Sequence, residues 1–527
     1  MIYHCEDHTC NYWDEGEKLP ERCPQCGRKL LRANEADMTG DDWTALGNTL
    51  WDAEASDKKR MVDCFRKAAY LGSAWGVCNL GICMEQGNGV EADPVQAFWL
   101  YQQAVEMGSL NAVCCLGVCY QYGIGTAPDA KQAAELYCKA AEYGSPRGQM
   151  LLAHAFHDGI GVEADAAEAV HWVRAAAYQR YGEGMHRLGV CYEYGDGVEQ
   201  NWERAVHWFR EAAESGVGVA MTDLGYCYEK GCGVEQSWEQ AFSWYRRGAE
   251  CGYPVSMSNL GLCYKRGYGV EQNWQEAIKW YEQGAQCGNL QSMHNLACCY
   301  EHGEGVEQNM TEAIRWYTAA AEGGNADDMY ELGWQYDHGE GVEQDMKKAI
   351  CWYERAAEQN HPAAMNSLGE CYAMGRGVPR DLETAMEWYR RAAELGEAMA
   401  DYNMGWHLEQ AGKLSEAYTH YRKAADGNDD SAWWALGRFY ENGVVVAQDG
   451  KEARRCYETG EKLGSVKCKM RLARCKLLGI GGRRAKKAGL DLCRQALELA
   501  KESSEKEDYG YEAEMNLLRR TIAENES

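Results

Sequence analysis

The chain has 527 residues, of which 46% are hydrophobic and 26% are charged, and these values exclude a largely disordered protein. Its 54 basic and 81 acidic side chains give a net charge of −27, which disfavours nucleic acid or anionic lipid as a general partner. Glycine, tyrosine, tryptophan and cysteine are abundant, whereas there are only 6 phenylalanines and 8 prolines. Such selective use of residue types indicates internal repetition.

The amino-terminal residues Met-Ile-Tyr-His-Cys-Glu-Asp-His lack the basic start and apolar core of a secretory signal. No stretch approaches the roughly 18 consecutive apolar residues of a membrane span. The odd total of 25 cysteines fits poorly with a fully paired disulfide framework. We therefore expect a cytoplasmic protein whose thiols are free and no membrane partner.

Four cysteines precede the first predicted helix with the spacing C-x4-C-x12-C-x2-C. They are Cys5, Cys10, Cys23 and Cys26. The segment 20–27 resembles the knuckle of zinc ribbons and rubredoxins, and four thiolates suit a closed, structural zinc site. We predict a zinc-ribbon-like, metal-binding segment at residues 1–38 with Zn²⁺ as its cofactor. Three alternatives stay open: iron in place of zinc, His8 in place of Cys10 as a ligand, and four thiols without metal.

The rest of the chain repeats with a period of 36 residues. A Leu-Gly pair, or Leu-Ala or Met-Gly in its place, recurs at every step of this period. The first residues of these pairs are Leu80, Leu116, Leu152, Leu188, Leu224, Leu260, Leu296, Leu332, Leu368 and Met404. Leu46, Leu436 and Leu472 extend the series to about thirteen units. A period of this length is typical of a solenoid of helix pairs.

Each unit predicts two helices joined by a tight turn. In one unit, Met185, Leu188, Cys191 and Tyr192 form the apolar stripe of a first helix, which ends at the glycines of segment 195–197. The second helix begins at a side chain that can accept a hydrogen bond from its first amides. These N-cap residues are Asp93, Asp129, Asp165, Asn201, Ser237, Asn273, Asn309, Asp345 and Asp381.

A tryptophan recurs at one place in the second helix, and we expect its side chain to be buried. The seven tryptophans are Trp172, Trp208, Trp244, Trp280, Trp316, Trp352 and Trp388. Small pairs such as Ala212-Ala213 follow and let neighbouring helices approach closely. The second helix mostly ends at glycine, with Arg180 and Asn360 as departures.

These motifs resemble the Sel-one-like repeat, a relative of the tetratricopeptide repeat. Residues 332–369 contain the complete pattern, from Leu332-Gly333 through Gly339-x-Gly341-Val342 to Trp352-Tyr353 and Ala356-Ala357. The resemblance implies right-handed α/α superhelices that serve as protein-interaction scaffolds or adaptors. We therefore predict an all-α fold in which a right-handed α/α superhelical solenoid of about 13 repeats spans residues 39–505. The connection after Met404 is four residues shorter than in the other units, which puts the local register in doubt.

Cysteine recurs three residues after the leucine of the Leu-Gly pair. This position holds Cys83, Cys119, Cys191, Cys227, Cys263, Cys299 and Cys371. Some secreted, cysteine-rich members of the family have disulfides within helix pairs and are linked to β-lactam binding or hydrolysis. Most units here lack a second cysteine column, so we interpret these residues as small buried apolar side chains. The sequence has no Walker lysine motif, Gly-x-Ser-x-Gly or His-Glu-x-x-His, and we predict a protein that is not an enzyme.

A partner is expected to bind at positions that vary between units. The residue two after each leucine forms an i, i+4, i+8 ridge on the first helix with the residues four before and four after it. Aromatic side chains on this ridge are natural anchors for a protein or peptide, although contact with water alone would also explain the variation. The candidate protein-binding residues are Tyr194, Tyr226, Trp334, Trp406, Tyr330 and Tyr402.

Residues 451–487 contain 13 Lys/Arg and only 3 Asp/Glu. This basic end can bind an acidic partner, mediate self-association with the acidic surface of another copy, contact nucleic acid, or simply be solvated. Residues 506–527 are predicted to form a C-terminal capping helix. The predicted function is a non-catalytic protein-interaction scaffold that binds a peptide or protein in its concave groove. The alternatives are a β-lactam-binding or hydrolysing repeat protein and a nucleic-acid adaptor that uses the zinc ribbon and the basic end.

Overall fold

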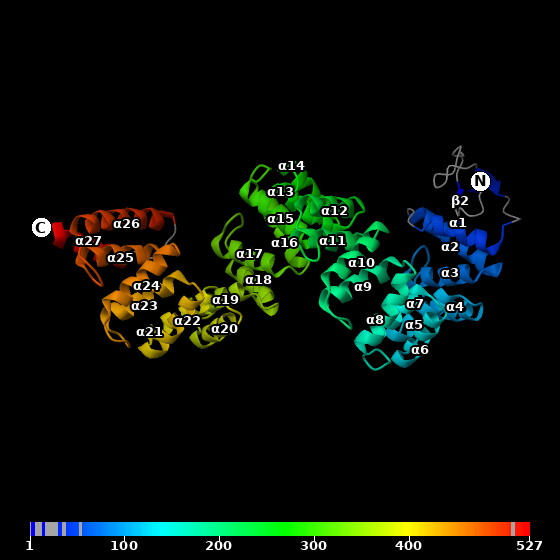
Figure 1. The fold of residues 1–527 in the computed structure, drawn as a ribbon, viewed down its shortest axis with the longest axis horizontal. Coiled ribbons are helices and arrows are strands. Elements are labelled where there is room, and N and C mark those ends of the chain that lie inside the picture. Colours follow the sequence, from blue (N-terminus) through cyan, green and yellow to red (C-terminus); the bar gives the residue numbers. More distant parts are fainter. Residues whose placement is uncertain are drawn as a thin grey trace. The chain divides into compact units, whose positions relative to one another are not determined.

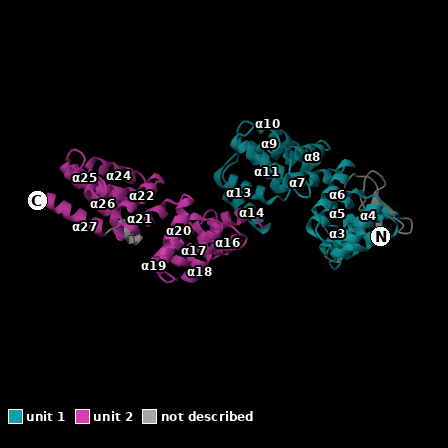
Figure 2. Ribbon diagram, turned by 90° about the horizontal axis from the view of Figure 1, so that it is seen from below, with its two compact units in different colours: residues 1–287 teal, residues 288–527 magenta. Residues whose placement is uncertain are grey.

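The structure is a computed structural model that describes residues 2–5, 13–15, 30–33, 38–51, 55–506 and 512–526 (Figure 1). The chain forms two compact units, residues 1–287 and residues 288–527 (Figure 2). The described part of unit 1 starts with three short antiparallel strands in the order β2-β1-β3. These are β1 (Ile2–Cys5), β2 (Trp13–Glu15) and β3 (Leu30–Ala33). Ile2 of the central strand is paired with Glu15 on one side and Ala33 on the other.

The described residues after this sheet form 27 helices, and every helix from α3 to α25 has 13 residues. The helices of unit 1 are α1 (Gly40–Thr49), α2 (Ala55–Tyr70), α3 (Ala74–Gln86), α4 (Pro94–Glu106), α5 (Leu110–Tyr122), α6 (Ala130–Glu142), α7 (Pro146–Asp158), α8 (Ala166–Tyr178), α9 (Gly182–Tyr194), α10 (Trp202–Glu214), α11 (Gly218–Lys230), α12 (Trp238–Glu250), α13 (Pro254–Arg266) and α14 (Trp274–Gln286). The helices of unit 2 are α15 (Leu290–His302), α16 (Met310–Glu322), α17 (Ala326–His338), α18 (Met346–Glu358), α19 (Pro362–Met374), α20 (Leu382–Glu394), α21 (Ala398–Gln410), α22 (Leu414–Asp426), α23 (Asp430–Asn442), α24 (Gly450–Lys462), α25 (Val466–Leu478), α26 (Lys486–Lys506) and α27 (Glu512–Glu526).

The helices pack in pairs, from α1 with α2 to α25 with α26, which confirms the predicted array of helix pairs. The side chains of all nine predicted N-cap residues accept hydrogen bonds from backbone amides in the first turn of the second helix. Except for α1 and α21, the first helices end at a left-handed glycine such as Gly195, whose φ is 76° and whose amide donates to the carbonyl of Cys191. Local capping therefore sets the boundaries of each helix.

The residue after each tryptophan, which is aromatic except for Val173, is buried more deeply than the tryptophan. Trp244 is buried as predicted, whereas the other six tryptophans of its column are only half-buried. The buried residues of the next column are Tyr101, Tyr137, Phe209, Tyr245, Tyr281, Tyr317, Tyr353, Tyr389, Tyr421 and Tyr457. The prediction for the tryptophans was wrong because a helix that carries two adjacent aromatic residues can point only one of them directly at its neighbour.

In the Leu-Gly repeats, the glycine lies in close contact with this buried ring. A Cβ atom on Gly261 would lie 2.5 Å from Cε1 of Tyr281, and Gly333 stands in the same relation to Tyr353. Of the two Leu-Ala repeats, the repeat of Ala153 holds the smaller Val173 in the aromatic column, whereas the repeat of Ala297 holds the buried Tyr317. The most regular motif of the sequence therefore serves packing.

Seven of the buried tyrosines also donate a hydrogen bond from their hydroxyl to a side chain at the end of the preceding first helix. The pairs are Tyr101–Glu85, Tyr137–Gln121, Tyr245–Glu229, Tyr317–Glu301, Tyr353–Asp337, Tyr421–Glu409 and Tyr457–Glu441, with oxygen–oxygen distances of 2.6–3.5 Å. Each bond satisfies a polar atom that would otherwise be buried without a partner.

The end of unit 2 departs from the regular pattern. At the shortened connection, Lys413 stands at the N-cap of α22 but makes no side-chain capping bond. Val445 adopts a φ of 63° at a position where most repeats have a left-handed glycine. Helix α27 packs against α25 and α26, and Arg471 donates two hydrogen bonds to Glu514 at 2.6 and 2.7 Å.

Candidate functional site

The three columns of the predicted ridge differ in their solvent exposure. The column two residues before the leucine is mostly buried, for example at Cys114 and Ser258. The column two residues after the leucine is half-buried or exposed, and the column six residues after it is exposed. We call these last two columns the first-helix face, and only they are open to a partner. The exposed column consists of Gln86, Tyr122, Asp158, Tyr194, Lys230, Arg266, His302, His338 and Met374.

Two of the predicted binding residues lie on neighbouring first helices of unit 1. Tyr194 on α9 is 72% exposed and Tyr226 on α11 is 44% exposed. The carboxylate of Glu193 raises the pKa of the Tyr194 hydroxyl, and the nearby Asp223 and Tyr226 act in the same direction. The structure thus brings these two rings together with carboxylates on the first-helix face.

The other four predicted residues lie in unit 2. Trp406 on α21 is 38% exposed, and Trp334 on α17 is half-buried and stacks on His338 with ring centroids 4.4 Å apart. Tyr330 is half-buried in the deeper column and stacks on His361 at 5.0 Å. Tyr402 occupies the same column, where burial raises the pKa of its hydroxyl to about 12. Trp334 and Trp406 therefore offer surface to a partner, whereas Tyr330 and Tyr402 mainly contact neighbouring helices.

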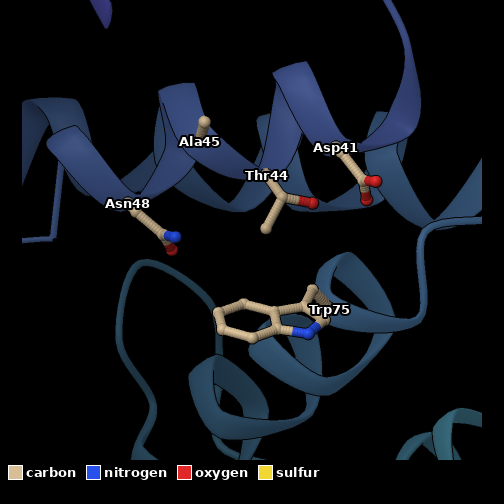
Figure 3. A pocket seen from close by; sticks show the side chains of 5 residues that line it. All are labelled: Asp41, Thr44, Ala45, Asn48 and Trp75. Carbon is tan, nitrogen blue, oxygen red and sulfur yellow. The ribbon is translucent and has the colours of Figure 1, made fainter. Parts of the chain in front are cut away.

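Trp75 on α3 is a further exposed aromatic residue that was not among the predicted binding residues. Its side chain is 63% exposed and faces α1 across a pocket of about 260 Å³ (Figure 3). The lining residues from α1 are Asp41, Thr44, Ala45 and Asn48. Trp75 lies five residues before Leu80, one turn outside the ridge, so a ridge widened by one turn would have included it.

The cysteine column behaves as the packing interpretation predicts. Burial raises the pKa of Cys83 and Cys191 to about 11 and that of Cys119 and Cys227 to about 12. These thiols are therefore protonated at neutral pH and pack as small apolar groups. Cys115 differs, because hydrogen bonding to Cys78 and the Arg147 guanidinium 3.6 Å away lower its pKa.

The predicted zinc ligands fall largely outside the described residues. Cys5 ends β1, whereas Cys10, Cys23 and Cys26 lie outside the described part of the chain. Across the side chains that the structure does describe, no three metal-binding residues come together. No described helix has both the length and the apolar character needed to cross a membrane.

The basic end is partly neutralised within unit 2 itself. Arg471 and Arg474 of α25 both contact Glu441 of α23, and Arg471 also pairs with Glu514 of α27. Arg484 donates a hydrogen bond of 2.6 Å to the Asn525 side chain. Several of the cations that were expected to bind a partner therefore hold the last helices in place.

Eleven segments of the chain match the family model of the Sel1 repeat. They are residues 76–109, 112–145, 146–181, 182–217, 218–253, 254–289, 290–325, 326–361, 362–397, 398–429 and 432–465. The chain belongs to the Sel1 repeat family. The helix pairs α1/α2 and α25/α26 flank the matched segments, so the described array contains thirteen helix pairs, of which eleven match the Sel1 model.

Two solved structures illustrate the relationship. The protective antigen c5321 of uropathogenic Escherichia coli, which has an SLR fold, is 29% identical with a TM-score of 0.57, over 81% of this chain and 94% of that one. A Sel1 repeat protein from Oxalobacter formigenes is also 29% identical, over 46% of this chain and 96% of that one, with a TM-score of 0.41. Comparison with curated proteins gives no match. A Sel1 solenoid fits a protein-interaction scaffold, and nothing favours either alternative function.

Proposed function

We propose that this Sel1 repeat protein is a non-catalytic scaffold that binds a peptide or protein segment on its first-helix face. The observation that carries the proposal is the exposure of Tyr194, Tyr226 and Trp406 in the two columns of the first-helix face. Large aromatic side chains form the energetic centres of many protein interfaces, because they bury much apolar area at small cost in conformational entropy. Within each unit, a right-handed superhelix would place successive first helices along a concave groove.

Site-specific photo-crosslinking in the native cell tests this function. A photoreactive phenylalanine analogue at position 226 or 406 should give covalent adducts with other polypeptides. The same analogue at position 99 or 143 is a matched control, because Trp99 on the second helix α4 and Tyr143 at the end of the second helix α6 are more exposed than Tyr226 and Trp406. Equal adduct formation at all four positions would contradict binding by the first-helix face.

The proposal includes a structural zinc ion held by Cys5, Cys10, Cys23 and Cys26, which is supported by their spacing and by the short sheet that contains Cys5. Elemental analysis of the purified full chain should find about one zinc per molecule, and the double substitution Cys23→Ser and Cys26→Ser should remove it. Cys251→Ser is the matched control, because Cys251 is an exposed thiol within the repeats. Less than about half an equivalent in the unsubstituted protein would reject the site.

A cytoplasmic location is also part of the proposal, because a reducing compartment keeps the buried thiols of the first helices intact. Thiol counting under denaturing conditions should find the cysteines of the repeats reduced. Self-association through the remaining exposed cations, such as Arg455 and Lys462, is a further proposal. It predicts a salt-sensitive increase in mass with concentration in analytical ultracentrifugation.

A further inference from the structure

Four successive first helices of unit 2 carry acidic residues but neither lysine nor arginine. Helices α15, α17, α19 and α21 contain one, four, one and two carboxylates, respectively. These are Glu301, Asp327, Asp328, Glu331, Asp337, Glu370, Asp401 and Glu409. Trp334 and Trp406 lie on two of these helices, so the exposed aromatic surface of unit 2 is set in a strongly negative environment.

Several of these carboxylates are already paired with groups of the same unit. The pairs are Asp328 with His294, Asp337 with Arg376, Asp401 with His420, Glu409 with Arg438, and Asp327 with His361. The Tyr317 hydroxyl donates to Glu301. Among the described side chains, none forms an ion pair with Glu331, and Glu370 has only the longer contact with Arg376.

Glu370 belongs to the first-helix face, and Glu331 is a half-buried residue of the adjoining column, three residues before Trp334. Burial and the nearby Glu301 raise the pKa of Glu331. Glu370 accepts hydrogen bonds of 3.2 Å from the Asn366 and Asn403 amides, and the nearest cation, Arg376, lies 3.8 Å away while it also contacts Asp337. A cation from outside would therefore gain favourable interactions with both groups.

Glu370 lies in the same column as the two tryptophans, with α17 and α21 on either side of its own helix. Asn403 of α21 donates to Glu370, and Arg376, which follows α19, bonds to Asp337 of α17. These contacts hold the three helices together, so that the column presents Trp334, Glu370 and Trp406 in succession.

On the second helices, arginine side chains lie over several tryptophan rings. Four tryptophans of the second-helix column have an arginine guanidinium 4.2–4.7 Å from the ring centroid. The pairs are Trp244–Arg247, Trp316–Arg315, Trp352–Arg355 and Trp388–Arg391. In contrast, no lysine or arginine among the described residues lies over Trp334 or Trp406. His338 stacks on Trp334, so the ring of Trp406 and the part of Trp334 that His338 leaves uncovered are available for a cation that the partner supplies.

We propose that α17, α19 and α21 bind an arginine-rich segment of a partner polypeptide. Guanidinium groups stack on Trp334 and Trp406 and donate hydrogen bonds to Glu331 and Glu370. Arginine fits better than lysine because its planar group stacks on a ring and binds a carboxylate through two donors at once. The inference rests on the proposed scaffold function and adds the chemical class of its partner.

The test uses the full chain and a fluorescent 12-residue peptide in which four arginines alternate with Gly-Ser spacers, followed by anisotropy. The same peptide with citrulline, which has nearly the same shape but no charge, should bind at least about tenfold more weakly. Trp406→Ala and Glu370→Gln should each weaken binding of the arginine peptide by about five- to tenfold. Trp406→Leu keeps an apolar side chain but removes the aromatic ring. Together with a thermal melt of each variant, it checks that weaker peptide binding does not come from unfolding.

Two variants control for the general negative charge of the protein. Trp99→Ala and Glu354→Gln change an exposed tryptophan and an exposed carboxylate on second helices, and both should stay within about twofold of the unsubstituted protein. The inference is overturned if the control variants weaken binding as much as the face variants, or if arginine and citrulline peptides bind equally. Adducts at position 406 with polypeptides that lack basic segments would retain the scaffold function and refute its arginine specificity.

Discussion

The repeats that begin with α13 and α17 have the same fold but fill two buried columns differently. In α13 these columns hold Ser256 and Cys263, whereas in α17 they hold Asp328 and Gln335, which are just as deeply buried. One oxygen of Asp328 is bonded to His294, but its other oxygen and both amide atoms of Gln335 have no hydrogen-bond partner among the described residues. The comparison separates contacts that the fold requires from polar groups that it merely tolerates.

The contact between the glycine and the buried tyrosine ring should be equally sensitive to substitution in both repeats. Gly261→Ala and Gly333→Ala each place a methyl group about 2.5 Å from a buried tyrosine ring, and each should destabilise its repeat by about 2–3 kcal/mol. Urea unfolding combined with hydrogen exchange of the two helix pairs measures the loss. Leu262→Ala is the control because its side chain is exposed beside Gly261, and it should cost under about 0.5 kcal/mol. Tolerance of either glycine substitution would show that the ring can move aside.

The buried charge in α17 should make this repeat sensitive to alkaline pH. The hydrogen bond with Asp328 raises the pKa of His294 to about 10. Because the folded-state pKa exceeds that of the unfolded chain, the stabilisation is complete below about pH 6.5 and is lost as the pH rises through about 10. We expect unit 2 to lose about 2 kcal/mol over this range, since burial of Asp328 offsets part of the gain.

Thermal melts between pH 6 and pH 10 measure this effect. His294→Gln keeps a polar side chain but cannot become charged, so its melting temperature should depend less on pH than that of the unsubstituted protein. An identical pH profile for the two proteins would assign the alkaline sensitivity to other groups.

Replacing the buried side-chain amide of Gln335 should stabilise the protein. Gln335→Met keeps most of the buried volume and removes an amide that makes no protein hydrogen bond, so we expect a gain of about 1 kcal/mol. Denaturant titration measures the gain, and Cys263→Met in the α13 repeat, which overfills a packed site, should destabilise by comparison. A loss of stability in Gln335→Met would show that the amide is hydrogen-bonded to water in solution.

The smallest effect is expected at Val445, which departs from the regular pattern in its backbone. Its φ of 63° is costly for a β-branched residue, so Val445→Gly should raise stability by about 0.5 kcal/mol once the flexibility of glycine is included. Val444→Gly, at the adjacent position, should lower stability instead. Equal effects of the two substitutions would show that the strain at Val445 is relieved by its surroundings.

The helix pairs could be predicted from the sequence because their causes are local. Period, glycine turns and N-cap residues act within a few positions of the chain, and all nine N-caps are confirmed. The choice between tryptophan and tyrosine for the core could not be predicted, since the two residues are adjacent in the helix and the direction of each ring depends on a helix 20 residues earlier, where the glycine of the Leu-Gly pair lies against the tyrosine. The exposure of Trp75 and the ion pair between Arg471 and Glu514 likewise depend on contacts between separate helices.

The hydroxyls of the buried tyrosines affect the acidic side chains at the ends of the first helices. Where the buried ring is Tyr245, its oxygen holds the carboxylate of Glu229 in one position. Where the ring is Phe209, that oxygen is missing, and the equivalent Glu193 interacts with the exposed Tyr194 instead. A single buried atom thus decides whether an acidic side chain is anchored or left to reorient. Exchange of tyrosine for phenylalanine can therefore change the position of an acidic side chain on the surface of a single repeat while the fold is preserved.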